Sequence, residues 1–120
     1  MPFEARTLGR TGLKVGPIGL GSSYGLSEAG VEEAFELGCN YMYWGSLRRS
    51  GFGRGLRNIC EKDRDGVVIV VQSYTRIGCL MGWSVGRAIR WLKIDHADVL
   101  LLGWWNGEPP NRIRDAALAL

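Results

Sequence analysis

Aromatic, arginine and hydroxyl side chains recur just after the apolar runs of this chain, where they would suit a planar or anionic ligand. The set consists of Ser22, Ser23, Tyr24, Tyr43, Trp44, Arg48, Arg49, Gln72, Tyr74, Arg76, Trp104 and Trp105. Rings of this kind stack on planar groups, and guanidinium groups form paired hydrogen bonds with carboxylates and phosphates. The alternative is that the rings pack loops onto strand ends and that the arginines are solvated.

A local basic patch lies near the middle of the chain and comprises Arg48, Arg49, Arg54 and Arg57. Positive charge at the start of a helix opposes the helix dipole. Arg48 and Arg49 would therefore be mildly unfavourable unless an anion lies between them. Phosphate or carboxylate binding is one interpretation of this patch, and a solvated charged face is the other.

Three further features carry weaker signals. Segment 19–25 is rich in glycine, but its spacing is not G-x-G-x-x-G, and Tyr43 stands where a dinucleotide-binding domain needs an acidic residue. Segment 95–98 resembles a metal cluster in composition, but it precedes a strand, and we expect a hydrogen-bonded turn. The cysteines, Cys39, Cys60 and Cys79, are expected to be buried packing residues.

The elements that must position these residues alternate between strand and helix. Apolar runs predict strands at 17–21, 40–44, 67–72 and 98–103, and their continuity is typical of a parallel sheet buried on both faces. Residues 5–16 are expected to form a hairpin before the first strand. Helices are predicted from Ser27 to Gly38, over 50–62, from a cap at Ser84, and from Asn111 onward.

Composition limits the function classes. The chain has 120 residues, of which 46% are hydrophobic and 22% charged, as in an ordinary globular domain. A net charge of +3 without a dense basic run argues against nucleic-acid binding. No apolar run is long enough for a membrane helix, and the start shows no signal peptide. Three widely spaced cysteines favour reduced thiols in the cytoplasm.

The end of the chain predicts an incomplete domain. The last helix begins near Asn111 and runs to Leu120 without a capping glycine, so we expect the chain to stop inside its fourth helix. Four βα units in sequence would leave the outer strands unpaired. Residues 1–120 are therefore expected to be part of a larger domain, or a half that self-associates through its open sheet edges.

Several segments together resemble the aldo-keto reductase family. They are the opening segment 6–15, segments 18–21 and 36–41, residues 84–92, and residues 95–102. The resemblance implies the N-terminal half of a TIM-type (β/α)8 barrel, with about four βα units behind a β-hairpin; a whole barrel needs ~250 residues. In that barrel Tyr41 and Tyr43 would share the inward face.

The resemblance also implies NADP as cofactor and hydride transfer to carbonyl compounds. The family uses an aspartate, a tyrosine, a lysine and a histidine, and the matching positions here hold Tyr43, Arg48, Gln72 and Gly103. Gly103 offers no side chain, Gln72 carries no charge, and Arg48 stays protonated and cannot act as a general acid. The ordinary reductase mechanism is therefore expected to fail. A rearranged mechanism would use Tyr43 as proton donor with Arg48 as its electrostatic helper.

These observations predict an α/β partial barrel of an oxidoreductase family with altered or lost catalysis. The resemblance implies cofactor contacts at Gly21, Ser22 and Ser23, and the rim suggests a substrate pocket at Tyr24, Trp44, Trp104 and Trp105. The alternative is a non-catalytic pseudoenzyme barrel that binds a nucleotide or an anionic or aromatic small molecule. No metal, nucleic-acid or membrane partner is expected.

Overall fold

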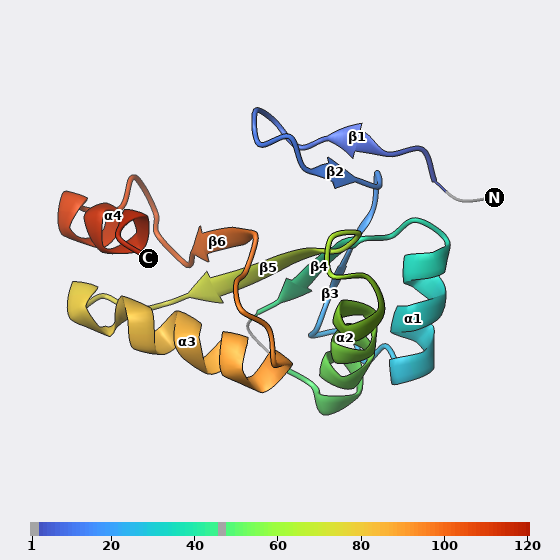
Figure 1. The fold of residues 1–120 in the computed structure, drawn as a ribbon. Coiled ribbons are helices and arrows are strands. Elements are labelled where there is room, and N and C mark those ends of the chain that lie inside the picture. The colour runs from blue at the N-terminus through green and yellow to red at the C-terminus, as the bar shows by residue number, and fades with distance from the viewer. Residues whose placement is uncertain (1–2, 46–47) are drawn as a thin grey trace.

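The strands of the chain form a hairpin and a four-stranded parallel sheet (Figure 1). The structure is a computed structural model, and it describes residues 3–45 and 48–120. In the hairpin, β1 (Arg6–Thr7) pairs antiparallel with β2 (Lys14–Val15). The sheet has the order β3 (Gly19–Gly21), β4 (Tyr41–Trp44), β5 (Val68–Ser73) and β6 (Val99–Leu102). The predicted hairpin and all four predicted strands are confirmed, with small shifts at the strand ends.

A helix follows each strand of the sheet, as expected for successive βα units. These helices are α1 (Glu28–Glu36), α2 (Ser50–Asp63), α3 (Met81–Leu92) and α4 (Asn111–Leu118), and a short 3-10 turn, η1 (Gly78–Leu80), precedes α3. Figure 1 shows α1, α2 and α3 on one side of the sheet and the hairpin on the other. The sheet is therefore covered differently on its two faces.

The helix ends confirm one predicted cap and correct another. Ser27 caps α1, because its Oγ accepts a hydrogen bond from the Gly30 amide at 3.1 Å. Gly38 follows that helix with φ +98°, a conformation that favours glycine. The predicted cap at Ser84 is wrong, since α3 already begins at Met81. Ser84 instead lies inside the helix, and its hydroxyl bonds the Ser73 hydroxyl at 3.0 Å.

Strand alternation divides the core into two parts. One part lies between the sheet and the helices. It contains the even-numbered side chains of β4 and the odd-numbered side chains of β5, packed with residues of α1, α2 and α3. The strand residues include Met42, Trp44, Ile69 and Val71. Toward the hairpin lie Val68 and Val70, packed with Tyr41 and Tyr43 and with the hairpin residues Leu8, Leu13 and Val15. The predicted shared face of Tyr41 and Tyr43 is confirmed.

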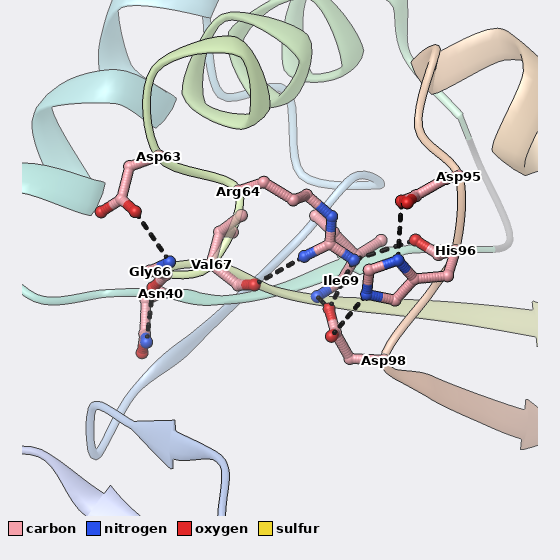
Figure 2. A network of polar contacts seen from close by, with 9 residues as sticks. All are labelled: Asn40, Asp63, Arg64, Gly66, Val67, Ile69, Asp95, His96 and Asp98. Atoms are coloured by element: carbon pink, nitrogen blue, oxygen red, sulfur yellow. Dashed lines mark hydrogen bonds and ion pairs between the residues drawn. The ribbon is translucent and has the colours of Figure 1, made fainter.

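A polar network joins the amino ends of the strands (Figure 2). Asp98 accepts hydrogen bonds from the Ile69 amide at 2.7 Å and from Arg64 at 3.0 Å, and Arg64 also donates to the carbonyls of Val67 and His96. His96 Nδ1 lies 2.6 Å from an Asp95 carboxylate oxygen. These contacts confirm that segment 95–98 forms a hydrogen-bonded turn, at the end of the sheet opposite the candidate site.

Asn40 ties the hairpin to the same network. Its side-chain oxygen accepts from the Gly16 amide at 2.8 Å, and its side-chain nitrogen donates to the carbonyls of Lys14 and Gly66. Asn40 therefore adds hydrogen bonds to the apolar packing that holds the hairpin against the sheet. The cysteines are only partly as predicted: Cys39 is buried and Cys60 half-buried, but Cys79 is exposed because it lies in η1 at the surface.

Candidate functional site

Two phenols and one amide meet above the carboxyl ends of β4 and β5, on the inner face of the sheet. Tyr43 and Tyr74 both donate their hydroxyl protons to Gln72 Oε1, the second at 3.0 Å. The two phenol oxygens lie 3.3 Å apart. We call Tyr43, Gln72 and Tyr74 the phenol–amide cluster. It exists because Gln72 and Tyr74 share one face of β5 and its extension, beside the inward face of β4.

Gly103 completes the floor of the cluster by having no side chain. A Cβ atom at this position would lie 2.2 Å from Gln72 Nε2 and 2.6 Å from the Tyr74 ring. Such separations are far shorter than van der Waals contact. The space that a side chain of β6 would take is therefore filled by Gln72 and Tyr74, and no imidazole fits at position 103 in this arrangement.

Three of the four positions inferred from the family resemblance are thus brought together, namely Tyr43, Gln72 and Gly103. The fourth, Arg48, precedes α2 and lines a groove together with Arg87 and Trp91 of α3. Burial and the nearby Arg87 lower the pKa of Arg48, and the phenols of Tyr43 and Tyr74 act in the opposite direction. Arg48 is therefore close enough to the cluster to act on it electrostatically, and it remains a cation.

Arg76 has a structural role at this rim. Its guanidinium donates to the carbonyls of Tyr74 and Gly103, both at 3.1 Å, and of Trp104 at 2.7 Å. Its Cζ lies 3.9 Å from the centre of the Trp105 ring. These bonds join the loops after β5 and β6, so the guanidinium is already occupied by backbone oxygens and a ring.

Trp104 provides the exposed aromatic surface beside the cluster. Its backbone has φ +58°, a left-handed conformation that is uncommon for a tryptophan. This geometry leaves the side chain 79% exposed with its ring centre 4.8 Å from that of Tyr74. A planar ligand above the phenol–amide cluster would meet an indole face here.

The residues predicted to touch a cofactor lie at the end of β3. Ser22 is buried, its Oγ accepts from the Gly45 amide at 3.2 Å, and its amide donates to the Tyr43 carbonyl at 3.0 Å. Ser22 therefore links the ends of β3 and β4. Gly21 lies beneath the exposed ring of Tyr24, since a Cβ there would come within 3.2 Å of that ring. Ser23 follows in the turn after β3.

Of the predicted pocket residues, Tyr24, Trp104 and Trp105 lie on loops at this end of the sheet. The prediction that Trp44 lines the same pocket is wrong. Trp44 is 1% exposed and packs toward the helices, 4.8 Å from the Trp91 ring centre and 6.4 Å from that of Phe52. The reason is strand alternation, which turns Trp44 outward because Tyr43 faces inward. The sequence predicts Tyr74 as a rim residue but does not predict its contact with Gln72 and Tyr43. Its two-residue spacing from Gln72 indicates that the two side chains share a face.

Other kinds of site are not apparent in the described part of the chain. Residues 3–45 and 48–120 contain no group of three metal-ligating side chains placed to hold an ion. No helix within these ranges has both the length and the apolar character needed to cross a membrane. The phenol–amide cluster and the surrounding rings thus remain the candidate site.

Comparison with known proteins gives one relative in sequence and several in structure, while no family model matches. The chain is 32% identical over 118 residues to L-galactose dehydrogenase of Arabidopsis thaliana, covering 82% of this chain and 37% of that protein. Its fold matches an aldo-keto reductase from Klebsiella pneumoniae solved with NADPH, with a TM-score of 0.68, 21% identity, and coverage of 88% of this chain and 41% of that one.

A thermostable aldo-keto reductase solved with the inhibitor epalrestat matches with a TM-score of 0.76 and 20% identity, over 98% of this chain and 49% of that one. The chain thus spans less than half the length of each of these three proteins. The predicted fold, a part of a TIM-type barrel with a hairpin before it, is confirmed.

Proposed function

Because the chain is related to the aldo-keto reductase family, we propose that it forms part of an NADP-dependent oxidoreductase for carbonyl compounds whose catalysis is altered or lost. The observation that carries the second half of this proposal is the phenol–amide cluster. It occupies the place where the family resemblance puts the reacting groups, and its central member is a neutral amide rather than a lysine.

The chemistry of the cluster supports this proposal. A phenol becomes a useful acid near neutral pH when an adjacent cation stabilises its ionised form. In the cluster, Tyr43 and Tyr74 both donate hydrogen bonds to the neutral Gln72 amide, which stands where the resemblance puts the lysine. Gly103 provides no group to orient a carbonyl. The cluster therefore lacks both the lysine and the histidine of the ordinary reductase mechanism.

The cofactor part of the proposal rests on relatives. The two Klebsiella pneumoniae structures contain NADPH, and NADP with acetate. In this chain, the backbone at the end of β3, around Gly21, Ser22 and Ser23, would hold the nicotinamide side, and the bound cofactor would supply the hydride. The hydroxyl of Ser22 is engaged with Gly45, so this chain would bind mainly through main-chain groups.

NADPH binding is tested by energy transfer from tryptophan to the bound dihydronicotinamide. Trp104 is placed to report on the rim, and a Trp104→Phe variant identifies its share of the signal. We expect saturable energy transfer that NADP competes away. A signal that rises linearly with NADPH, or that NADP leaves unchanged, would contradict the cofactor assignment.

A second candidate function is a non-catalytic barrel that binds an anionic or aromatic small molecule. The exposed Trp104 ring beside Tyr74 favours it, because this pair offers a stacking surface that needs no reaction. NADPH binding without any carbonyl-dependent turnover would favour this candidate over an altered enzyme. A cytoplasmic location is part of either proposal, and the odd number and wide spacing of the cysteines support it.

Self-association is a third proposal, and exposed apolar side chains at one sheet edge support it. In the described sheet, β6 pairs with β5 on one side, and a groove of about 330 Å³ beside it is lined by Leu100, Leu102, Arg114, Ala117 and Leu118. Leu118 is 86% exposed. Light scattering should give the mass of a dimer; a monomer with native near-UV circular dichroism would contradict this proposal.

A further inference from the structure

We propose that the groove between α3 and the chain just before α2 binds a phosphate group between the guanidinium groups of Arg48 and Arg87. The groove has a volume of about 190 Å³ and is lined by Trp44, Arg48, Arg87, Ala88 and Trp91. Its wall contains two cations and no carboxylate. This site lies on the helix side of the sheet, whereas the phenol–amide cluster faces the hairpin side, so the proposal does not depend on the proposed function.

Among the described residues, the two groove arginines lack an acidic partner, as Arg57 does and as Arg54 does not. Arg54 pairs with Glu28 at 2.9 Å, and Arg57 donates to the Trp91 carbonyl at 2.6 Å while lying over its ring. Within the described residues, no carboxylate lies within ion-pair distance of Arg48 or Arg87. In the described part of the chain, Arg87 lies over the face of the Trp83 ring, with its Cζ 5.0 Å from the ring centre.

The electrostatics of this pair call for an anion. Burial and the charge of Arg87 both lower the pKa of Arg48, as expected for two cations that line one groove and repel each other. Both residues are solvent-exposed, so a small anion can reach them. A tetrahedral oxyanion between them would reverse that repulsion and accept charge-assisted hydrogen bonds from both guanidinium groups.

Two further groups near the groove are relevant, namely the indole N–H of Trp44 and the first turn of α2. Trp44 is buried, and in the described structure its Nε1–H has no partner. Helix α2 begins two residues after Arg48; its cap residue Arg49 forms no side-chain cap bond, and its first turn has no acidic residue. The positive end of this 14-residue helix, which follows Arg48 in the chain, therefore also favours an anion. The Trp44 Nε1–H is itself buried, so it would report on binding nearby and would not contact the anion.

Close packing fixes the shape of the groove before any ligand binds. Trp44 is packed between Phe52 and Trp91, and Gly53 allows both indoles to approach because its Cβ position would overlap their rings. Ala88 is buried beneath them. Among the described lining residues, binding therefore mainly requires ordering of the Arg48 and Arg87 side chains, which limits the entropic cost of binding.

The test is a titration with inorganic phosphate at constant ionic strength, followed by the tryptophan indole signals in proton–nitrogen NMR spectra. We expect saturable shifts of the Trp44 and Trp91 signals. Arg87→Gln should weaken the apparent affinity by about tenfold, the loss of one charge-assisted contact. Arg90→Gln, on the same helix but outside the groove, is the matched control and should change the affinity less than about twofold.

Two results would overturn the proposal. Shifts that never saturate would show that no site exists, and equal weakening by the Arg87 and Arg90 substitutions would show diffuse attraction to a basic surface. Near-UV circular dichroism of each variant establishes that its fold is retained. Phenyl phosphate separates the two sources of the group: tighter binding than inorganic phosphate assigns a phosphate monoester, while equal or weaker binding assigns the free ion.

Discussion

Gly53 offers a direct test of how tightly the Trp44–Trp91 pair packs against α2. Glycine inside a helix costs ~0.5–1 kcal/mol relative to alanine, so Gly53→Ala would stabilise the protein if space were available. The structure leaves none. The new Cβ would lie 2.2 Å from Trp91 Cζ3 and 2.5 Å from Trp44 Cη2, while carbon atoms in contact are separated by ~3.5–4.0 Å.

A retreat of either indole would break existing contacts. Trp44 is 1% exposed and stacked on Phe52. Trp91 is 36% exposed, but it is held between Trp44 and the guanidinium of Arg57. Overpacking of this kind costs ~1–3 kcal/mol, and overlap with two rings places it at the upper end of that range. After the gain in helix propensity is subtracted, Gly53→Ala should lower the free energy of unfolding by ~2 kcal/mol.

Urea unfolding followed by tryptophan fluorescence measures the difference. Gly51→Ala is the matched control, because it lies in the same helix and its Cβ would come no closer than 3.7 Å to any atom. This control should be neutral or stabilising by up to ~1 kcal/mol. A Gly53→Ala protein as stable as the Gly51→Ala protein would refute the described packing of the two indoles.

Three further predictions concern charge and thiol reactivity. Asp98→Asn should lower the free energy of unfolding by ~3 kcal/mol, because it leaves the largely buried Arg64 without its charged partner, while Asp95→Asn, at an exposed position, should have little effect in the same urea titration. Hydrogen bonds from Arg54 and Asn58 lower the pKa of Glu28, so this carboxylate stabilises the folded state above its unfolded pKa and loses that contribution as the pH falls through its folded pKa. Glu28→Gln should therefore lower the melting temperature at pH 7, with a gap that closes well below pH 4.5; a gap that persists in acid would contradict the pairing. Burial raises the pKa of the Cys60 thiol to about 11, so iodoacetamide at pH 8 should label Cys79 well before Cys60, as mass spectrometry of peptides would show, and equal labelling would contradict the burial.

The spacing of apolar residues predicted the order of strands and helices, because each element depends mainly on its own local sequence. Apolar runs and turn residues place the hairpin, the four strands and the helices near their observed positions, and Ser27 and Gly38 mark the ends of α1. The predicted start of α3 failed for a physical reason. Ser84 has the chemistry of a cap, but Met81 is buried and is already part of the helix, so packing extends the helix toward the preceding turn.

The candidate site was less accessible to sequence reasoning. Alternation within β4 correctly turned Tyr43 inward, and the same rule sends Trp44 into the helix-facing core, although its position at the strand end suggested a pocket. The role of Arg76 depends on carbonyls of two different loops and on the left-handed backbone of Trp104. Such contacts join residues far apart in sequence, and no local pattern encodes them.

The most direct test of the central proposal is carbonyl-dependent oxidation of NADPH by the protein, followed by absorbance with a broad panel of aldehydes and ketones. Tyr43→Phe is measured beside Tyr41→Phe, which lies on the same face of β4 but outside the phenol–amide cluster. We predict either no carbonyl-dependent rate above the protein-free background or a weak rate that Tyr43→Phe abolishes and Tyr41→Phe leaves intact. A brisk rate that survives Tyr43→Phe would contradict the proposal that catalysis at this site is altered or lost.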